Sequence, residues 1–304
     1  MHYGVYVHLP WCRTRCHYCS FNIAIAKSPP QRAYTDALLE QWAKTRELFE
    51  GPPATLFFGG GTPSLHPPEE LGRLIEAVGA GFVELEANPE DLDHAPEWRA
   101  LGVNRLSIGV QSFDARQIRF LNRVHRAEQL AERVRQVTPL FDSWSADLIF
   151  GLPGQSLQDL EADLRRLLDT DPPHVSLYGL TAHPGTAFAR SVERGRFQVD
   201  DDQQATMLDH IVSRLKEAGR PRYEVSNFAR PGHRSPHNEL VWRGHPYLGL
   251  GAGAHGWLPD GRRTVGVADP AHFIATRAWE VEQPRPRQQA IDLIITTMRH
   301  VDGL

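Results

Sequence analysis

The chain has 304 residues, which is enough to bury a large core and suits either one α/β barrel or two smaller domains. A formal net charge of −4 and the scatter of its 33 basic residues disfavour a nucleic-acid partner. We find neither a signal-peptide pattern nor a run of about 20 apolar residues, and therefore expect no transmembrane segment and a cytoplasmic location.

Short β-branched or aromatic runs alternate with longer helical patterns, which is typical of successive βα units and a parallel sheet. Six strands are expected, at residues 5–9, 55–58, 82–87, 105–110, 144–150 and 174–180. Helical patterns lie between them, at residues 31–49, 68–78, 93–101, 114–136 and 156–169. We therefore predict an α/β fold, a partial (β/α)6 barrel of the TIM type, over residues 1–185.

The regular alternation of strand and helix patterns ends at about residue 185. The remaining patterns are a helix at 201–218, a strand-like segment at 223–229, a glycine-rich segment at 249–256 and a final helix at 290–301. They predict a smaller C-terminal α+β layer on the barrel over residues 186–304. Because the sequence stops directly after the final helix, we expect that a further C-terminal piece is missing.

The most distinctive short motifs lie where expected strands end. A cysteine loop follows the first strand, residues 59–64 follow the second, and Glu86 closes the third; Gln111 follows the fourth, and Asp147 lies near the end of the fifth. Functional groups of parallel barrels gather at this edge, because the βα loops there can vary without disturbing the packed interior. We therefore expect one site at the carboxyl ends of the strands.

All three cysteines, Cys12, Cys16 and Cys19, fall in one C-x3-C-x2-C loop. An odd, clustered set disfavours a disulfide framework and indicates a thiolate-bound metal centre. Three thiolates can hold three irons of a [4Fe-4S] cluster and leave the fourth iron open. The methionine end of S-adenosylmethionine (SAM) can bind that iron, after which one electron can release a 5′-deoxyadenosyl radical.

Two alternatives for the cysteines stay open. A structural zinc site can combine them with His8 or His17, although such sites usually draw ligands from two separated pairs. Buried, unreactive cysteines are the other alternative, which the tight spacing and the polar neighbours Arg13 and Arg15 disfavour.

Residues 59–64 read Gly-Gly-Gly-Thr-Pro-Ser and directly follow an apolar strand. Consecutive glycines let the backbone approach a ligand closely. Alone, the pattern also fits a tight turn, but its place one βα unit after the cysteine loop favours a binding role.

With these motifs the chain resembles the radical SAM proteins of the oxygen-independent coproporphyrinogen III oxidase type, and within them the haem chaperone branch. The resemblance runs from Tyr6 to Trp257. It rests on a series of motifs in the expected order: YVHLPWCRTRCHYCSF, FFGGGTPS, LEANPED, NRLSIGVQSF, LNRVHR, DLIFGLPGQ, YEVSNFA and GLGAGAHG.

The resemblance implies a role for each matching position. The residues implied to ligate the cluster are Cys12, Cys16 and Cys19. Those implied to border the SAM pocket or meet its amino group are Tyr6, Phe21, Gly60, Gly61 and Thr62. Those implied to contact the SAM carboxylate, ribose or other polar parts are Glu86, Gln111, Arg123 and Asp147.

Some of these side chains also have plainer interpretations. Glu86 fits a charge at a helix N-terminus, Asp147 a hydrogen-bond acceptor at the barrel mouth, and Arg123 a surface cation. The residue types nevertheless suit a nucleotide, since carboxylates accept from hydroxyl and ammonium groups and arginine pairs with a carboxylate in a fork.

Departures from the family pattern favour the chaperone branch. The oxidases resemble C-x3-C-x2-C-x-C, but here Phe21 stands at the position of the additional cysteine. The chain also starts almost at the first strand, without the N-terminal segment of those oxidases. The branch implies a protein that binds haem and delivers it to haem-accepting proteins.

An HNxxYW-like motif of that branch reads His237-Asn238-Glu-Leu-Val241-Trp242, with valine in place of the tyrosine. His237 is a candidate haem ligand because neutral imidazole is a common axial donor, and a polar loop histidine without metal is the alternative. His255 has the same two interpretations, as a ligand or as a residue packed among glycines.

Three functions follow, of which a haem-binding and haem-transferring radical SAM protein is the first. The second is a radical SAM enzyme of porphyrin metabolism, either the oxidase itself or a related methyltransferase. The third is a zinc-stabilised barrel. The first two also require an electron donor such as flavodoxin or ferredoxin.

Overall fold

The computed structural model describes residues 2–123 and 127–303. Within these residues eleven strands form one sheet, and its centre consists of six parallel strands that follow one another in chain order. They are β1 (Gly4–Leu9), β4 (Thr55–Gly60), β5 (Phe82–Ala87), β6 (Arg105–Gln111), β7 (Ser143–Phe150) and β8 (His174–Gly179). The predicted partial (β/α)6 barrel is confirmed, and each expected strand lies within two residues of an observed one.

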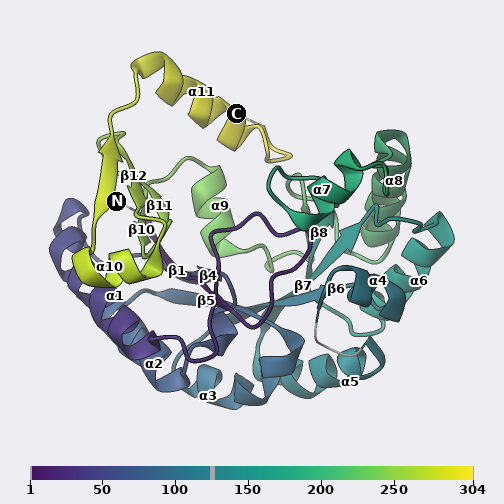
Figure 1. Cartoon of the computed structure of the whole chain (residues 1–304), viewed down its shortest axis with the longest axis horizontal. Helices are drawn as coiled ribbons and strands as arrows, with labels where there is room; N and C mark the ends of the chain where they lie inside the picture. The colour runs from purple at the N-terminus through teal and green to yellow at the C-terminus, as the bar shows by residue number, and fades with distance from the viewer. Residues whose placement is uncertain (1, 124–126, 304) are drawn as a thin grey trace.

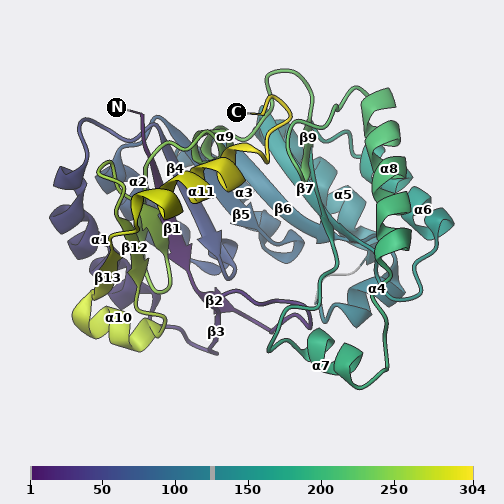
Figure 2. The ribbon, with the colours of Figure 1, turned by 90° about the horizontal axis from the view of Figure 1, so that it is seen from above.

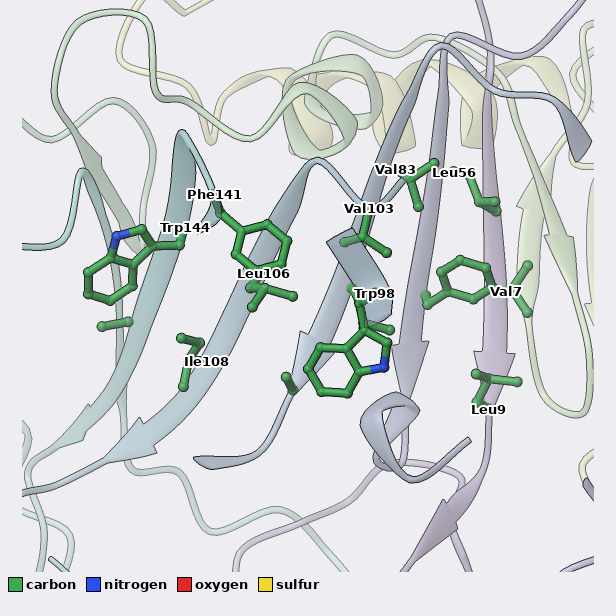
Figure 3. Close-up of a cluster of buried hydrophobic side chains, with 14 of the residues drawn as sticks. Val7, Leu9, Leu56, Val83, Trp98, Val103, Leu106, Ile108, Phe141 and Trp144 are labelled. Atoms are coloured by element: carbon green, nitrogen blue, oxygen red, sulfur yellow. The ribbon is translucent and has the colours of Figure 1, made fainter. Parts of the chain in front are cut away.

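Helices cover the outer side of this curved sheet (Figure 1). They are α1 (Gln31–Thr45), α2 (Pro68–Val78), α3 (Ala95–Ala100), α4 (Ala115–Phe120), α5 (Ala127–Val137) and α6 (Leu157–Leu168). Short 3-10 helices adjoin several of these elements: η1 (Arg46–Leu48), η2 (Pro63–Leu65), η3 (Pro89–His94) and η4 (Thr138–Leu140). The apolar core lies between strands and helices, and it includes Trp98 of α3 and Leu106 and Ile108 of β6 (Figure 3).

The sequence of α2 shows why these helices form where they do. Pro68 occupies its first turn, and Gly79 ends it with a φ of 64°, a left-handed conformation that glycine adopts without strain. Leu71 and Leu74 recur at helical spacing and are fully buried against the sheet. The result is a short amphipathic helix that begins soon after the loop following β4.

The helix expected over residues 114–136 is wrong as a single element. It is divided into α4 and α5, and Asn122, after α4, has a φ of 58°. A left-handed residue cannot continue a right-handed helix, so the apolar periodicity runs across a real break. Residues 124–126 between the two helices, part of the LNRVHR motif, lie outside the described residues.

The C-terminal part contains α7 (Ala187–Glu193), α8 (Asp201–Glu217), β9 (Asn227–Ala229), α9 (Pro236–Trp242), β10 (Tyr247–Leu250), β11 (His255–Trp257), β12 (Arg263–Gly266), α10 (Pro270–Thr276), β13 (Trp279–Glu282) and α11 (Pro286–Thr297). Its strands extend the barrel sheet at both edges, because β10 pairs in parallel with β1 and β9 pairs antiparallel with β8. The α+β part is thus continuous with the sheet, and the domain boundary at residue 185 stays a prediction.

The two ends of the parallel strands carry different structures (Figure 2). The carboxyl end holds α7 and the cysteine loop with its short strands β2 (Trp11–Cys12) and β3 (Ala24–Ile25). The amino end holds α9 and α11. Among the described helices, none combines the length and the apolar character needed to cross a bilayer.

Candidate functional site

A cavity of about 570 Å³ opens at the carboxyl end of the barrel. Its walls come from the cysteine loop, the glycine turn after β4 and the ends of β5 to β8. Among the residues that the sequence analysis singled out, those lining it are Cys12, Cys16, Cys19, Phe21, Gly60, Gly61, Thr62, Glu86, Gln111, Arg123 and Asp147. The fold thus brings these scattered motifs to one place.

The three thiols stand on one wall of this cavity, free of disulfides and partly exposed. Thr62 Oγ1 donates to Cys12 Sγ at 3.3 Å, and Arg123 Nη1 lies 3.7 Å from Cys16 Sγ. The loop is also anchored to the end of α4, where Asn122 Nδ2 donates to the carbonyl of Arg15 at 2.9 Å. Polar donors on the sulfurs suit thiolates, which accept hydrogen bonds.

The donor set fits a [4Fe-4S] cluster. Burial raises the pKa of Cys12 to about 11 and also raises that of Cys19, so both thiols need a cationic partner to ionise at neutral pH. In the described part of the chain, no three ligating side chains converge on one metal position. Cluster cysteines need not converge, since each binds a different iron.

The two histidines of the zinc alternative differ in their contacts. His8 Nε2 lies 2.8 Å from the carbonyl oxygen of Asn22, and its Nδ1 lies 3.0 Å from the hydroxyl of Tyr6. His17 Nδ1 lies 2.7 Å from the carbonyl oxygen of Phe120. Both nitrogens of His8 are therefore engaged, which argues against His8 as a zinc ligand. The contact of His17 through Nδ1 leaves its Nε2 for a metal, so the zinc alternative with His17 stays open.

The glycine turn requires glycine for two separate reasons. Gly60 has a φ of 116°, a conformation that side chains rarely adopt. A Cβ on Gly61 would lie 2.6 Å from the carbonyl group of Pro10, just before the cysteine loop. Gly61 N and Thr62 N donate to the carbonyl oxygens of Leu9 and Trp11 at 2.9 Å. The turn and the cysteine loop are therefore fixed against each other.

Asn88, which the sequence analysis did not single out, links the polar side of the cavity. Its Oδ1 accepts from Arg123 Nη2 at 2.6 Å, and its Nδ2 lies 3.4 Å from Thr62 Oγ1. Arg123 Nη2 also donates to the carbonyl oxygen of Gly109 at 2.9 Å, so Arg123 is held inside the site and is not a surface cation. The place of Asn88 directly after β5, in the LEANPED motif, was the available signal.

Glu86 and Asp147 project into the cavity from β5 and β7. Asp147 accepts from the hydroxyls of Ser107 at 2.7 Å and Ser145 at 2.8 Å. Glu86 accepts from the backbone N–H of Gly60 at 3.3 Å. Burial, and secondarily the nearby carboxylate of Asp147, raise the pKa of Glu86 to about 8. Glu86 is thus a strand residue and not a helix N-terminal charge.

Gln111 lines the cavity, whereas Tyr6 does not. Gln111 has a φ of 67° beside a register shift between β6 and β7, so the strained backbone turns it into the cavity. Tyr6 is outside the cavity wall and packs on Phe57 with ring centroids 6.0 Å apart. Its role at the SAM pocket stays a prediction.

The two further histidines are far from equivalent. His237 is only 5 % exposed at the start of α9, and its Nδ1 lies 2.8 Å from the hydroxyl of Thr55 at the amino end of the barrel. Burial lowers its pKa to about 3. Of the two interpretations of His237, that of a polar loop histidine does not hold, because the residue is buried within a helix. His255, on β11, is exposed.

Comparisons with known proteins show the family of this chain. Residues 6–167 match the Radical SAM superfamily. Heme chaperone HemW of Bacillus subtilis is 37 % identical over 89 % of this chain and 75 % of its own length. Heme chaperone HemW of Escherichia coli is 35 % identical over 92 % of this chain and 78 % of its own length.

Among solved structures, coproporphyrinogen III oxidase (HemN) from Escherichia coli, described as a radical SAM enzyme, superimposes with a TM-score of 0.83. It is 24 % identical and covers 98 % of this chain and 76 % of its own, which shows a shared fold. The superfamily match spans more than half of the chain, and both bacterial relatives exceed 30 % identity over most of it. The chain therefore belongs to the radical SAM superfamily and, within it, to the HemW family.

Proposed function

We propose that this protein binds haem and transfers it to haem-dependent acceptor proteins, using a radical SAM barrel that holds a [4Fe-4S] cluster and SAM. One observation carries the proposal: two relatives named heme chaperones are 35 % and 37 % identical over about nine-tenths of the chain. Phe21, at the position of the oxidases' additional cysteine, supports the same choice.

In this proposal Cys12, Cys16 and Cys19 hold the cluster, which supplies an electron and an open iron for SAM. Thr62 and Arg123 stabilise sulfurs of the loop by the contacts described above. The close packing of Gly61 against Pro10 keeps the backbone of the turn next to the cluster, where the amino group of SAM can be received.

The polar wall supplies the remaining contacts for a nucleotide. Asp147 accepts hydrogen bonds from ribose hydroxyls, and Gln111 offers an amide. Arg123 brings positive charge for the methionine carboxylate. Glu86 carries a proton at neutral pH and can therefore donate a hydrogen bond as well as accept one.

We assign no residue of the barrel as the haem ligand. His237 is buried and hydrogen-bonded to Thr55, so axial ligation by it requires local opening of the amino end. His255 is the more accessible of the two candidates. The partners are haem-accepting proteins and a one-electron donor such as flavodoxin or ferredoxin. A cytoplasmic location completes the proposal, because the three unpaired thiols require a reducing compartment.

Haem titration of the anaerobically reconstituted chain tests the proposal. We expect stoichiometric binding, seen as a Soret band, and transfer of the bound haem to apomyoglobin as a surrogate acceptor. The His255→Ala and His237→Ala variants distinguish the two candidate ligands. Absence of haem binding by the native full-length protein would contradict the function.

The oxidase alternative has a direct assay. Coproporphyrinogen III is incubated anaerobically with the reconstituted protein, SAM and a reductant, and protoporphyrinogen IX is sought. We expect none, and accumulation of that product at catalytic turnover would replace the chaperone by the enzyme. A methylated porphyrin together with S-adenosylhomocysteine would indicate a methyltransferase instead.

A further inference from the structure

A line of hydrogen-bonded side chains runs through the barrel interior from its amino end to the cavity. The hydroxyl of Tyr223 lies 2.9 Å from His174 Nε2, and His174 Nδ1 lies 2.8 Å from Ser145 Oγ. Ser145 Oγ in turn lies 2.8 Å from Asp147 Oδ1. Tyr223 and His174 are almost wholly buried and line no part of the cavity. The function described so far makes no use of them.

Ionisation of Asp147 would fix the hydrogen atoms in this line. An ionised carboxylate only accepts, so the single hydroxyl hydrogen of Ser145 would then go to Asp147 and not to Ser176 Oγ, 3.1 Å away. His174 Nδ1 must then donate to Ser145 Oγ, which leaves Nε2 to accept from the hydroxyl of Tyr223. The oxygen of Tyr223 is free to accept from Ser235 N, 3.4 Å away. Every donor in the line points toward Asp147.

The surroundings keep the imidazole of His174 neutral, as this arrangement requires. Burial, assisted by the guanidinium of Arg105 on β6 and by the nearby ring of His233, lowers the pKa of His174 well below its ordinary value. A neutral imidazole with hydrogen on Nδ1 passes polarisation from one hydroxyl to the next. Protonated His174 could not accept from Tyr223.

The neighbouring acid, Glu86, accepts fewer hydrogen bonds than Asp147. Glu86 receives one backbone N–H, whereas Asp147 receives the hydroxyls of Ser107 and Ser145, and Ser176 also lowers its pKa. Burial opposes ionisation of both acids, but the positive charge of Arg105 favours the anion of Asp147. Other ionisable groups near the pair are Tyr178 on β8, which faces both acids, and Glu84 and Tyr6, which act on Glu86. The proton of the pair therefore resides on Glu86.

We propose that Tyr223, His174 and Ser145 are positioning residues that hold Asp147 as the anion of the Glu86–Asp147 pair, ready to accept hydrogen bonds from the hydroxyls of a bound nucleoside. The inference rests on the proposed function only in taking SAM as that nucleoside. It assigns a binding role to residues at the far end of the barrel, which never touch the ligand.

SAM affinity of the anaerobically reconstituted protein, measured by equilibrium dialysis between pH 5 and 9, tests this. Binding needs the Asp147 anion and is lost as the pH falls through the pKa of that group. Tyr223→Phe removes one hydrogen-bond donor from the line, so the Asp147 anion is less stabilised and the pKa of Asp147 rises. The acid limb of the binding profile therefore moves to higher pH. Loss of one such hydrogen bond corresponds to about three- to tenfold weaker binding on that limb.

Tyr3→Phe is the matched control, because the buried Tyr3 hydroxyl donates to the carbonyl oxygen of Gly51, outside the line. Its profile should coincide with that of the unmodified protein. His174→Phe should move the acid limb further than Tyr223→Phe, and His174→Gln should restore it in part, since an amide N–H can replace Nδ1–H. If the His174→Phe variant does not fold, the pH profile of SAM binding by Tyr223→Phe still tests the inference.

A uniform loss of affinity at every pH in the Tyr223→Phe and His174→Phe variants would show a merely structural role and overturn the inference, as would coinciding profiles. Nitrogen NMR of the protein, with His174 assigned by its loss in His174→Gln, should find the hydrogen on Nδ1. Hydrogen on Nε2 would also overturn it. Failure of haem transfer with an intact SAM profile would count against the proposed function alone.

Discussion

Glu84 and Glu86 stand two residues apart on β5 and face the same barrel interior, yet they lie in opposite environments. At the amino end, Glu84 is 3.3 Å from Arg105 Nε, accepts from Ser235 Oγ at 3.0 Å and from His237 N at 3.3 Å. At the carboxyl end, Glu86 has one backbone donor and a carboxylate for a neighbour. One strand thus serves structure at one end and chemistry at the other.

The difference shows how a barrel separates stability from function. The buried charge of Glu84 is compensated by Arg105 and α9, which close the amino end. Glu86 is left with unmet polar capacity that a ligand can satisfy. Polar groups left poorly compensated inside a cavity are typical of binding sites, since the cost of burying them is recovered only when the ligand arrives.

The largest effect is expected at the thiol loop. Cys12→Ser should abolish retention of the [4Fe-4S] cluster, because two thiolates leave one more iron without a ligand. Iron and sulfide analysis with the absorption spectrum of the anaerobically reconstituted protein measures this. Thermal unfolding of the metal-free protein should be almost unchanged, and full iron content in the variant would refute the assignment.

A smaller but substantial effect is expected at the amino end. Arg105→Leu leaves the buried carboxylate of Glu84 without its cation and should lower the free energy of unfolding by about 3 kcal/mol. Urea titration measures it. The double variant Arg105→Leu with Glu84→Leu should recover much of the loss, because no unpaired charge remains. Equal destabilisation of the single and double variants would contradict this account.

The smallest effect is a pH dependence at Glu86. Its pKa is raised from 4.5 to about 8 in the folded protein, so the folded state keeps a proton that the unfolded state releases. Stability therefore falls as the pH rises from 4.5 to 8, and Glu86→Gln should remove roughly 1–2 kcal/mol of that fall once water in the cavity is allowed for. Urea titration of the metal-free protein at pH 5 and pH 8 checks this.

Glu84→Gln is the matched control for that measurement. The same substitution two residues away should destabilise the protein, because it removes the anion that pairs with buried Arg105. Stabilisation by both variants at pH 8, or by neither, would erase the proposed contrast between the two ends of β5.

Local patterns predicted the strands and most of the site. The cysteine spacing, the three glycines after β4 and the acid at the end of β5 each reflect a requirement of nearby backbone, so they can be recognised without the fold. The break after Asn122 could not, because the apolar periodicity continues across it. Asn88 was missed since its partners, Thr62 and Arg123, are distant in the chain.

The sequence by itself determined the thiol loop, the six βα units and the membership of the radical SAM superfamily, because these depend on residue type and short spacing. Only the tertiary structure decided which acids are paired. His237 turned out to be buried, and Tyr223 proved to be joined to Asp147 through His174 and Ser145. Burial and charge pairing depend on contacts between strands that lie far apart in the chain, and such contacts leave no local pattern.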